Sequence, residues 1–286
     1  MLKLEQPTHT YEQVLEHCCL GITGNNELLQ KVISHRGLLC DEASDYIAVA
    51  LTEELYTISS TINQQGLDDP IVIGTLRKSE LIKLYNTYFV KSGKPGREIY
   101  DVLIAAANEK CPFCGGIGRP RNLDHYLPKA HYPQFSILPV NLVPSCRDCN
   151  MDGKGESFAI SKSEQVIQPY LDNDRYFNEQ WIFARYITNT DNEPGVIEYF
   201  VHAPEHWSNS QKQRVINHFN DFSLGLRFSK EASVRLVTYL AQIKKLQEIK
   251  LDIESAKEII LRPIIDVAPF VNHWDRVMCL TLLNEL

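Results

Sequence analysis

Apolar residues recur at every third or fourth position over most of this chain, which is the spacing of amphipathic helices. Thr10 and Gln13 have the spacing of a capping box and predict that a helix begins there. One apolar stripe predicts a long helix late in the chain and consists of Leu236, Leu240, Ile243, Leu246 and Ile249. From residue 208 onward the pattern is entirely helical. Further helices are expected over 26–39, 41–58, 79–90, 97–109 and 272 to about 283.

Three short stretches have the composition of strands. Residues 71–73 are β-branched, and the segments 181–188 and 196–202 are rich in β-branched and aromatic residues. The turn-forming residues 189–195 between the last two segments predict a hairpin. The clearest break is the stretch SGKPG at 92–96. We therefore expect an α+β fold of three regions: a helical N-terminal region over 1–95, a central unit over 96–168, and a helix-rich C-terminal region over 169–286.

The composition is that of an ordinary globular protein, since 44% of the 286 residues are hydrophobic and 23% are charged. No apolar run in the sequence reaches the ~20 residues of a membrane helix. The first residues carry charges where a signal peptide has an apolar segment. We therefore expect a cytoplasmic protein without a membrane partner. The net charge of −7 excludes a generally basic nucleic-acid coat, but the range 110–165 holds seven basic and five acidic residues and favours an anionic partner there.

Four of the eight cysteines form two CxxC pairs: Cys111 with Cys114, and Cys146 with Cys149. Two intervening residues let both thiolates of a pair reach one tetrahedral zinc ion at about 2.3 Å. Glycines that allow the tight turn of a zinc knuckle follow the first pair, namely Gly115, Gly116 and Gly118. A single CxxC can be a redox pair, but two of them favour a structural zinc site that holds a small subdomain together. The other cysteines are expected to be buried free thiols: Cys18, Cys19, Cys40 and Cys279.

Three further motifs interleave with these pairs: LDHYLP with Asp124 and His125, VNLVPSC with Asn141, and CRDCN with Asn150. Here the sequence resembles the HNH endonuclease family, in the form that has Asn in place of the last His. The resemblance covers residues 111 to roughly 165. It implies a ββα-metal fold, which is a β-hairpin followed by a helix, often held together by a zinc ion on four cysteines. The expected α+β fold is therefore this small unit between mainly helical flanks.

The resemblance, together with the chemistry of phosphodiester hydrolysis, implies a role for each of these residues. His125 would be the general base, because a neutral imidazole has a pKa close to the working pH. Asp124 and Asn150 would supply oxygen ligands to a hard Mg²⁺ or Mn²⁺ ion. Asn141 would form hydrogen bonds across the hairpin loop and orient the His125 ring. Plainer roles stay open, with Asn150 as a helix cap and Asn141 as an ordinary turn residue.

Basic residues of this unit are candidate phosphate contacts: Arg119, Arg121, Lys129, Arg147 and Lys154. The segment QPYLD at 168–172 is similar to the one that follows the zinc-bound HNH core in nuclease components of anti-phage systems of the Septu and Zorya types. This similarity implies a role in anti-phage defence, with protein partners in a defence complex. The HNH resemblance implies a DNA substrate, with RNA left open. Two functions stay open. One is a metal-dependent endonuclease that nicks or cuts DNA, and the other is a catalytically silent, zinc-stapled module that binds DNA or a protein.

Overall fold

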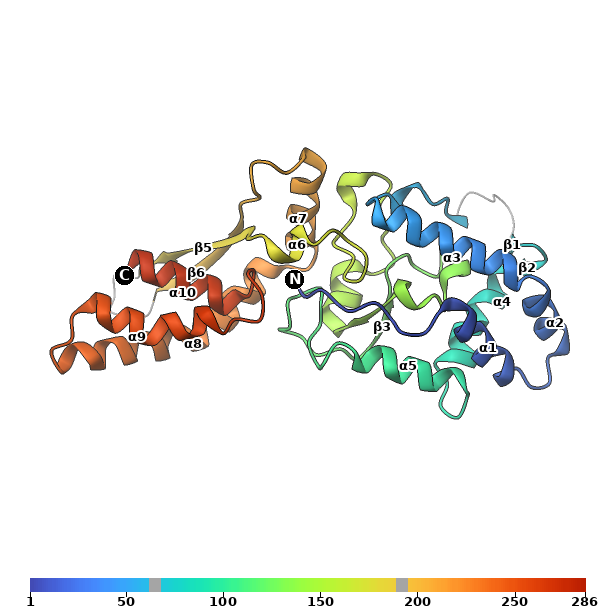
Figure 1. Cartoon of the computed structure of the whole chain (residues 1–286), viewed down its shortest axis with the longest axis horizontal. Coiled ribbons are helices and arrows are strands. Elements are labelled where there is room, and N and C mark those ends of the chain that lie inside the picture. The colour runs from blue at the N-terminus through green and yellow to red at the C-terminus, as the bar shows by residue number, and fades with distance from the viewer. Residues whose placement is uncertain (62–67, 189–194) are drawn as a thin grey trace.

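The computed structural model describes residues 1–61, 68–188 and 195–286. Figure 1 shows a broad body, built by the N-terminal and central elements, and a narrower arm built by the last hairpin and the last three helices. The buried apolar side chains form one cluster that runs through the body and into the arm. Within the described ranges, no helix is long and apolar enough to cross a membrane.

The N-terminal part of the body consists of α1 (Tyr11–Gly21), α2 (Asn26–Ser34), α3 (Arg36–Leu51), η1 (Leu55–Thr57), β1 (Ile71–Ile73), β2 (Leu76–Arg77), α4 (Lys78–Lys83), the π-helical η3 (Leu84–Phe89) and α5 (Gly96–Ala105). Thr10 caps α1 through the predicted capping box with Gln13. The predicted helix boundary near Cys40 is wrong, because α3 runs through this residue and the break lies at His35. The backbone N–H of Thr75 donates to His35 Nε2 at 3.1 Å, so a contact from a distant turn accompanies the break.

The central unit is a two-stranded antiparallel sheet followed by a short helix. Its elements are β3 (Asn122–His125), β4 (Leu142–Ser145) and the π-helical η6 (Asp148–Lys154). Asp124 lies opposite Val143, and His125 lies opposite Leu142. Helix α5 packs against both strands. The chain therefore has a strand–strand–helix order here, as the HNH resemblance implied, within a mixed α and β architecture.

The C-terminal part consists of α6 (Arg175–Asn178), β5 (Ile182–Ile187), β6 (Val196–Val201), α7 (Asn209–Asp221), α8 (Leu224–Glu248), α9 (Ile253–Asp266) and α10 (Trp274–Glu285). The arm comprises β5, β6, α8, α9 and α10. The predicted hairpin is confirmed, since β5 and β6 pair in antiparallel register; residues 189–194 of its turn lie outside the described ranges. On α8, Leu236 and Ile243 are buried as predicted, whereas Ile249 follows the end of this helix and is 73% exposed.

A buried ion pair holds the QPYLD segment, residues 168–172, in its position. Arg214 on α7 donates to Asp172 at 2.5 Å and lies 3.5 Å from Glu53, which follows α3. Gln168 donates to the carbonyl oxygen of Val140 at 2.7 Å, just before β4. Buried charges are tolerated when they are paired and hydrogen-bonded. These contacts therefore hold the segment after the central unit against α7 and the N-terminal helices. The region boundaries at 95 and 168 stay predictions.

Candidate metal centre and active site

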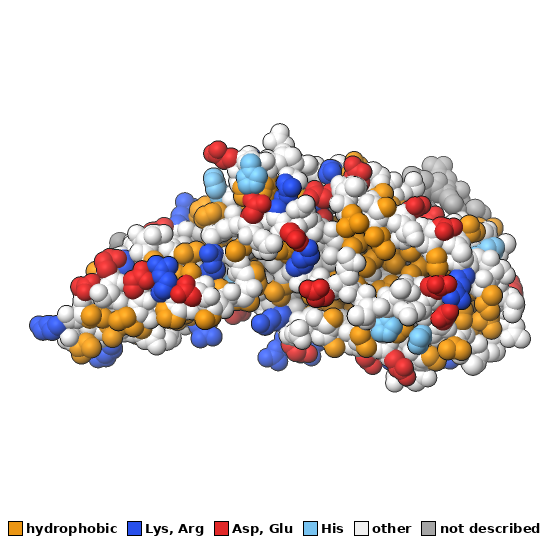
Figure 2. Space-filling view, in the orientation of Figure 1, with side chains coloured by type: hydrophobic (Ala, Val, Ile, Leu, Met, Phe, Trp, Pro, Cys, Tyr) orange, Lys and Arg blue, Asp and Glu red, His pale blue; other side chains and the backbone are white. Residues whose placement is uncertain are grey.

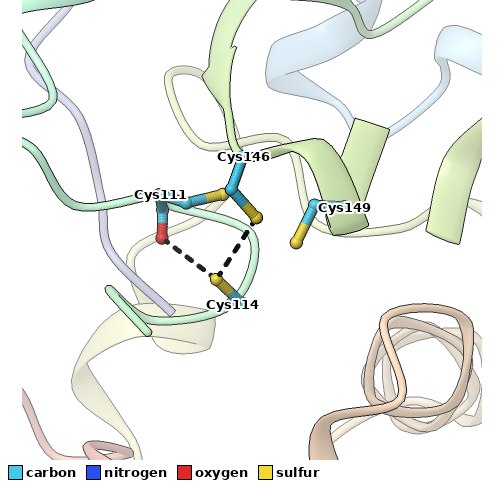
Figure 3. A group of neighbouring side chains, drawn as sticks. All are labelled: Cys111, Cys114, Cys146 and Cys149. Carbon is cyan, nitrogen blue, oxygen red and sulfur yellow. Dashed lines mark hydrogen bonds between the residues drawn. The ribbon is translucent and has the colours of Figure 1, made fainter. Parts of the chain in front are cut away.

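The four cysteines of the CxxC pairs converge on one point (Figure 3). Cys111 and Cys114 lie in the loop before β3, Cys146 follows β4, and Cys149 lies in η6. All four are buried, and their Sγ atoms lie within 4.8 Å of one another. In a tetrahedral site with Zn–S bonds of about 2.3 Å the sulfurs are about 3.8 Å apart. The cluster therefore fits a metal ion held by four thiolates, and a structural zinc would tie the loop, the strand and η6 together.

The backbone of the first CxxC pair needs its glycines. Gly115 and Gly116 have φ angles of +63° and +89°, in the left-handed region that residues with a side chain rarely adopt. Gly118 passes so close to the cluster that a Cβ atom there would lie 2.4 Å from Cys146 Sγ. Its N–H donates to Cys114 Sγ at 3.2 Å. This is the tight turn that the sequence predicted for a zinc knuckle.

Arg227, at the start of α8, adds a positive charge to the cluster. Its guanidinium donates to Cys149 Sγ at 3.2 Å and to Cys146 Sγ at 3.7 Å, and it lies 3.5 Å from Asp148. Four thiolates around one Zn²⁺ carry excess negative charge, which a guanidinium offsets. Arg227 could not be identified from the sequence, because 78 residues separate it from Cys149 and no motif marks it.

A pocket of about 430 Å³ lies next to the cluster, and Asp124, His125 and Asn150 all line it. Asn150 directly follows the metal-site residue Cys149. Lys129 lines the pocket as well, and its Nζ lies 5.2 Å from the centroid of the Tyr85 ring. The structure thus brings together the residues for which the HNH resemblance implied direct roles in catalysis, with one of the expected phosphate contacts beside them.

His125 is buried, with 6% of its surface exposed, and its ring is held from two sides. Nε2 lies 2.8 Å from the carbonyl oxygen of Ser136, and the Tyr85 ring meets the imidazole edge-on at a centroid distance of 4.4 Å. Because a carbonyl only accepts, the neutral ring carries its proton on Nε2 and keeps a lone pair on Nδ1. Burial lowers the pKa of His125 to about 3, and the charge of Lys129 acts in the same direction. The imidazole is therefore neutral at pH 7, but the expectation of a pKa close to the working pH is wrong, because burial disfavours the charged ring.

Asp124 is buried next to His125, and its Oδ2 atom has no hydrogen-bond partner among the described residues. The ammonium of Lys154 lies 3.9 Å from this oxygen. Burial raises the pKa of Asp124 to about 6, against the opposing effect of Lys154. A buried carboxylate oxygen without a hydrogen bond is costly unless a cation binds it. This oxygen therefore fits a ligand of a divalent cation in the pocket.

Asn141 is fully buried and uses both ends of its amide. Oδ1 accepts from the N–H of Leu127 at 2.7 Å and from the hydroxyl of Tyr46 at 3.1 Å. Nδ2 donates to the carbonyl oxygens of Leu127 and Phe135, both at 3.1 Å. Phe135 immediately precedes Ser136, whose carbonyl holds the imidazole. Asn141 thus braces the β3–β4 loop that carries this carbonyl, which is consistent with the orienting role that the resemblance implied.

The basic residues named as phosphate contacts occupy different environments. Three are exposed near the cysteine cluster: Arg119, Arg121 and Arg147. Lys154 instead is only 7% exposed and donates to the carbonyl oxygen of His125 at 2.6 Å. Burial lowers its pKa, against the opposing effect of Asp124. Lys154 therefore lies beneath the strand that carries Asp124 and His125, and its phosphate contact stays a prediction.

Known proteins that resemble this chain include one from a bacteriophage and one from a bacterium. Septu protein PtuB of Bacillus thuringiensis is 34% identical over 84 residues, which is 28% of this chain and 31% of PtuB. This partial similarity is compatible with the expected link to a defence system. No family model and no solved structure matches. Protein ea31 of Escherichia phage lambda is 37% identical over an alignment of 295 residues that covers 100% of this chain and 98% of ea31. The chain therefore belongs to the family of phage lambda protein ea31.

Proposed function

We propose that this protein is a metal-dependent endonuclease that hydrolyses DNA phosphodiester bonds. One observation carries the proposal: His125, neutral and with its lone pair on Nδ1, lines the same pocket as Asn150 and Asp124, whose Oδ2 atom accepts no hydrogen bond within the described ranges. A general base, a carboxylate and a neutral oxygen ligand are groups that metal-assisted hydrolysis of a phosphodiester uses.

In this mechanism His125 accepts the proton of the attacking water at Nδ1. The Ser136 carbonyl and the Tyr85 edge hold the ring, so that its orientation is set before the reaction begins. As the proton moves to Nδ1, the water oxygen bonds to phosphorus and the bond from phosphorus to the leaving oxygen breaks. The imidazolium that forms already donates its Nε2 proton to Ser136, which stabilises the positive charge.

Asp124 and Asn150 would hold Mg²⁺ or Mn²⁺, which when bound supplies a Lewis acid for the phosphate oxygens. Because its pKa is about 6, the Asp124 carboxyl is mostly ionised at pH 7 and above. Asn150 adds no charge, so the ion would stay more electrophilic than between two carboxylates. Lys129, which lines the pocket, would contact the phosphate. The similarity to a Septu protein supports a role in anti-phage defence, with protein partners.

The position of Lys154 favours a second candidate function. Its ammonium, 3.9 Å from Asp124 Oδ2, could itself balance the buried carboxylate. The pocket would then need no divalent cation, and the central unit would be a catalytically silent, zinc-stapled module that binds DNA or a protein.

Conversion of supercoiled plasmid separates the two candidates. The endonuclease proposal expects open-circular or linear product with Mg²⁺ or Mn²⁺ and none without added divalent cation. Asp124→Asn should lower the rate by about 100-fold and raise the Mn²⁺ concentration that is needed. The matched control is Asp152→Asn, an exposed carboxylate in η6, which should cleave like the wild type. No conversion by the wild type at any cation concentration would favour the silent module, whereas full activity of Asp124→Asn would contradict the role of Asp124 as a cation ligand.

A further inference from the structure

Helix α8 concentrates positive charge on a chain whose net charge is −7. From residue 224, where α8 begins, to residue 250, two residues beyond its end, the sequence has six basic residues and only two acidic ones, Glu231 and Glu248. The basic residues are Arg227, Lys230, Arg235, Lys244, Lys245 and Lys250. The local charge of +4 exceeds that of the central unit, and the overall acidity of the chain conceals it.

The two faces of α8 differ in chemistry. Its buried face, which includes Phe228 and Leu236, packs against β6 and α9. At 100° per residue, Lys230 and Lys244 lie on the opposite face, and both are exposed. Neither is ion-paired with any residue of the described ranges, whereas Lys245 pairs with Glu248. Figure 2 shows Lys and Arg side chains along the lower edge of the arm and where the arm meets the body.

This face begins beside the candidate active site. Arg227 donates to the sulfur of Cys149, and the next residue along the chain, Asn150, lines the pocket. Lys230 follows Arg227 by one turn of α8, and the helix then continues along the arm away from the body (Figure 1). A polyanion that occupies the pocket can therefore extend along α8. Two exposed valines lie on this face between the lysines, Val234 at 72% and Val237 at 51%, and the one carboxylate between the lysines in the sequence, Glu231, lies 100° around the helix from Lys230.

Resting on the proposed endonuclease function, we propose that the outer face of α8 is a track for the phosphate backbone of duplex DNA beyond the cleavage site. Lys230 and Lys244 are 14 residues apart, which is about 21 Å along the helix. This length corresponds to about six base pairs of B-form DNA. Contacts to phosphate oxygens fix the position of the duplex and carry no sequence information. The track therefore adds affinity and a minimum substrate length, and no sequence preference.

Fluorescence anisotropy with a labelled 24-base-pair duplex, without added divalent cation, tests the track. The double variant Lys230→Gln/Lys244→Gln is compared with Lys83→Gln/Lys91→Gln, two exposed lysines of the body. Each lost phosphate contact should lower the slope of log affinity against log salt by about 0.9. We therefore expect the α8 variant to lower this slope by about 2 and the affinity by about tenfold or more, while the body variant leaves both unchanged. With an 8-base-pair duplex, the difference in affinity between the α8 variant and the wild type should be much smaller.

Equal salt slopes for the two double variants would overturn the track, as would a wild type that binds no duplex. The endonuclease proposal is judged separately by plasmid conversion with Mg²⁺ or Mn²⁺. If duplex binding depends on Lys230 and Lys244 but the protein does not cleave, the track proposal stands and the endonuclease proposal fails. If the protein cleaves but duplex binding does not depend on these lysines, the endonuclease proposal stands and the track proposal fails.

Discussion

The cysteine cluster and the Asp124–His125 pocket adjoin within one small unit, but different contacts hold each of them together. Four sulfurs from two CxxC pairs form the cluster, so all of its candidate metal ligands come from the central unit. The pocket also depends on a group outside the central unit, because Tyr85 comes from η3, while the acceptor Ser136 lies in the β3–β4 loop of the unit itself. A metal that binds the cluster would build the unit, whereas the surrounding body shapes the pocket. Loss of a cluster sulfur should unfold the unit, whereas loss of a pocket residue should remove activity and leave the fold intact.

Removal of one sulfur tests the structural half of this comparison and has the largest expected effect. Cys149→Ser should lose the zinc and the cooperative unfolding of the central unit, since a structural zinc site contributes on the order of 10 kcal/mol to folding. Zinc content per chain and thermal unfolding are the measurements. Cys40→Ser, at a half-buried thiol outside the cluster, is the control and should retain both. Wild-type stability of Cys149→Ser would show that the cluster does not build the fold.

Arg227 offers a smaller perturbation of the same cluster. Arg227→Met keeps the length of the side chain and removes the charge that faces Cys146 and Cys149. We expect a 10- to 100-fold loss of zinc affinity, roughly the effect of removing a group that supports metal ligands. Competition with a chromophoric chelator measures this loss, with the exposed Arg235→Met as control. Identical affinities for the two variants would leave Arg227 with a packing role only.

The smallest expected effect is on the pH dependence of stability. It concerns His218, a buried residue that contacts the loop of the first CxxC pair. Its ring accepts from the N–H of Ile167 and lies 2.8 Å from the carbonyl oxygen of Phe113, which lies between Cys111 and Cys114. Burial lowers the pKa of His218 to about 3. Below pH 6.5 His218 is therefore protonated in the unfolded chain but stays neutral in the folded chain. The free energy of unfolding consequently falls as the pH drops toward 3.

At pH 5 this loss amounts to about 2 kcal/mol relative to neutral pH. His218→Gln, which has no titrating ring, should lose less stability between pH 7.5 and pH 5 than the wild type does. Urea unfolding at the two pH values measures the difference, with His206→Gln at an exposed site as control. The same pH dependence in all three proteins would mean that His218 is not the group responsible.

The sequence predicted those features that depend on residues close together in the chain. The spacing of the CxxC pairs and their glycines predicted the cluster, and two segments rich in β-branched and aromatic residues, joined by turn-forming residues, predicted the β5–β6 hairpin. The α2–α3 break at His35 was missed because Thr75, 40 residues away, contacts the ring there. Arg227 and Ser136 were missed for the same reason, since no local pattern identifies the partner of a sulfur or an imidazole. Lys154 was named as a candidate phosphate contact from its sequence position alone, and packing places it under the strand.

His125→Ala separates catalysis from folding in a single purified protein, because its zinc content and its plasmid conversion can both be measured. We expect wild-type zinc content, a wild-type thermal unfolding profile within a few degrees, and a fall in the cleavage rate of about 10²- to 10⁴-fold, which is the contribution of a general base. Cleavage at the wild-type rate, with the zinc content unchanged, would contradict the assignment of His125 as the base and of this pocket as the active site.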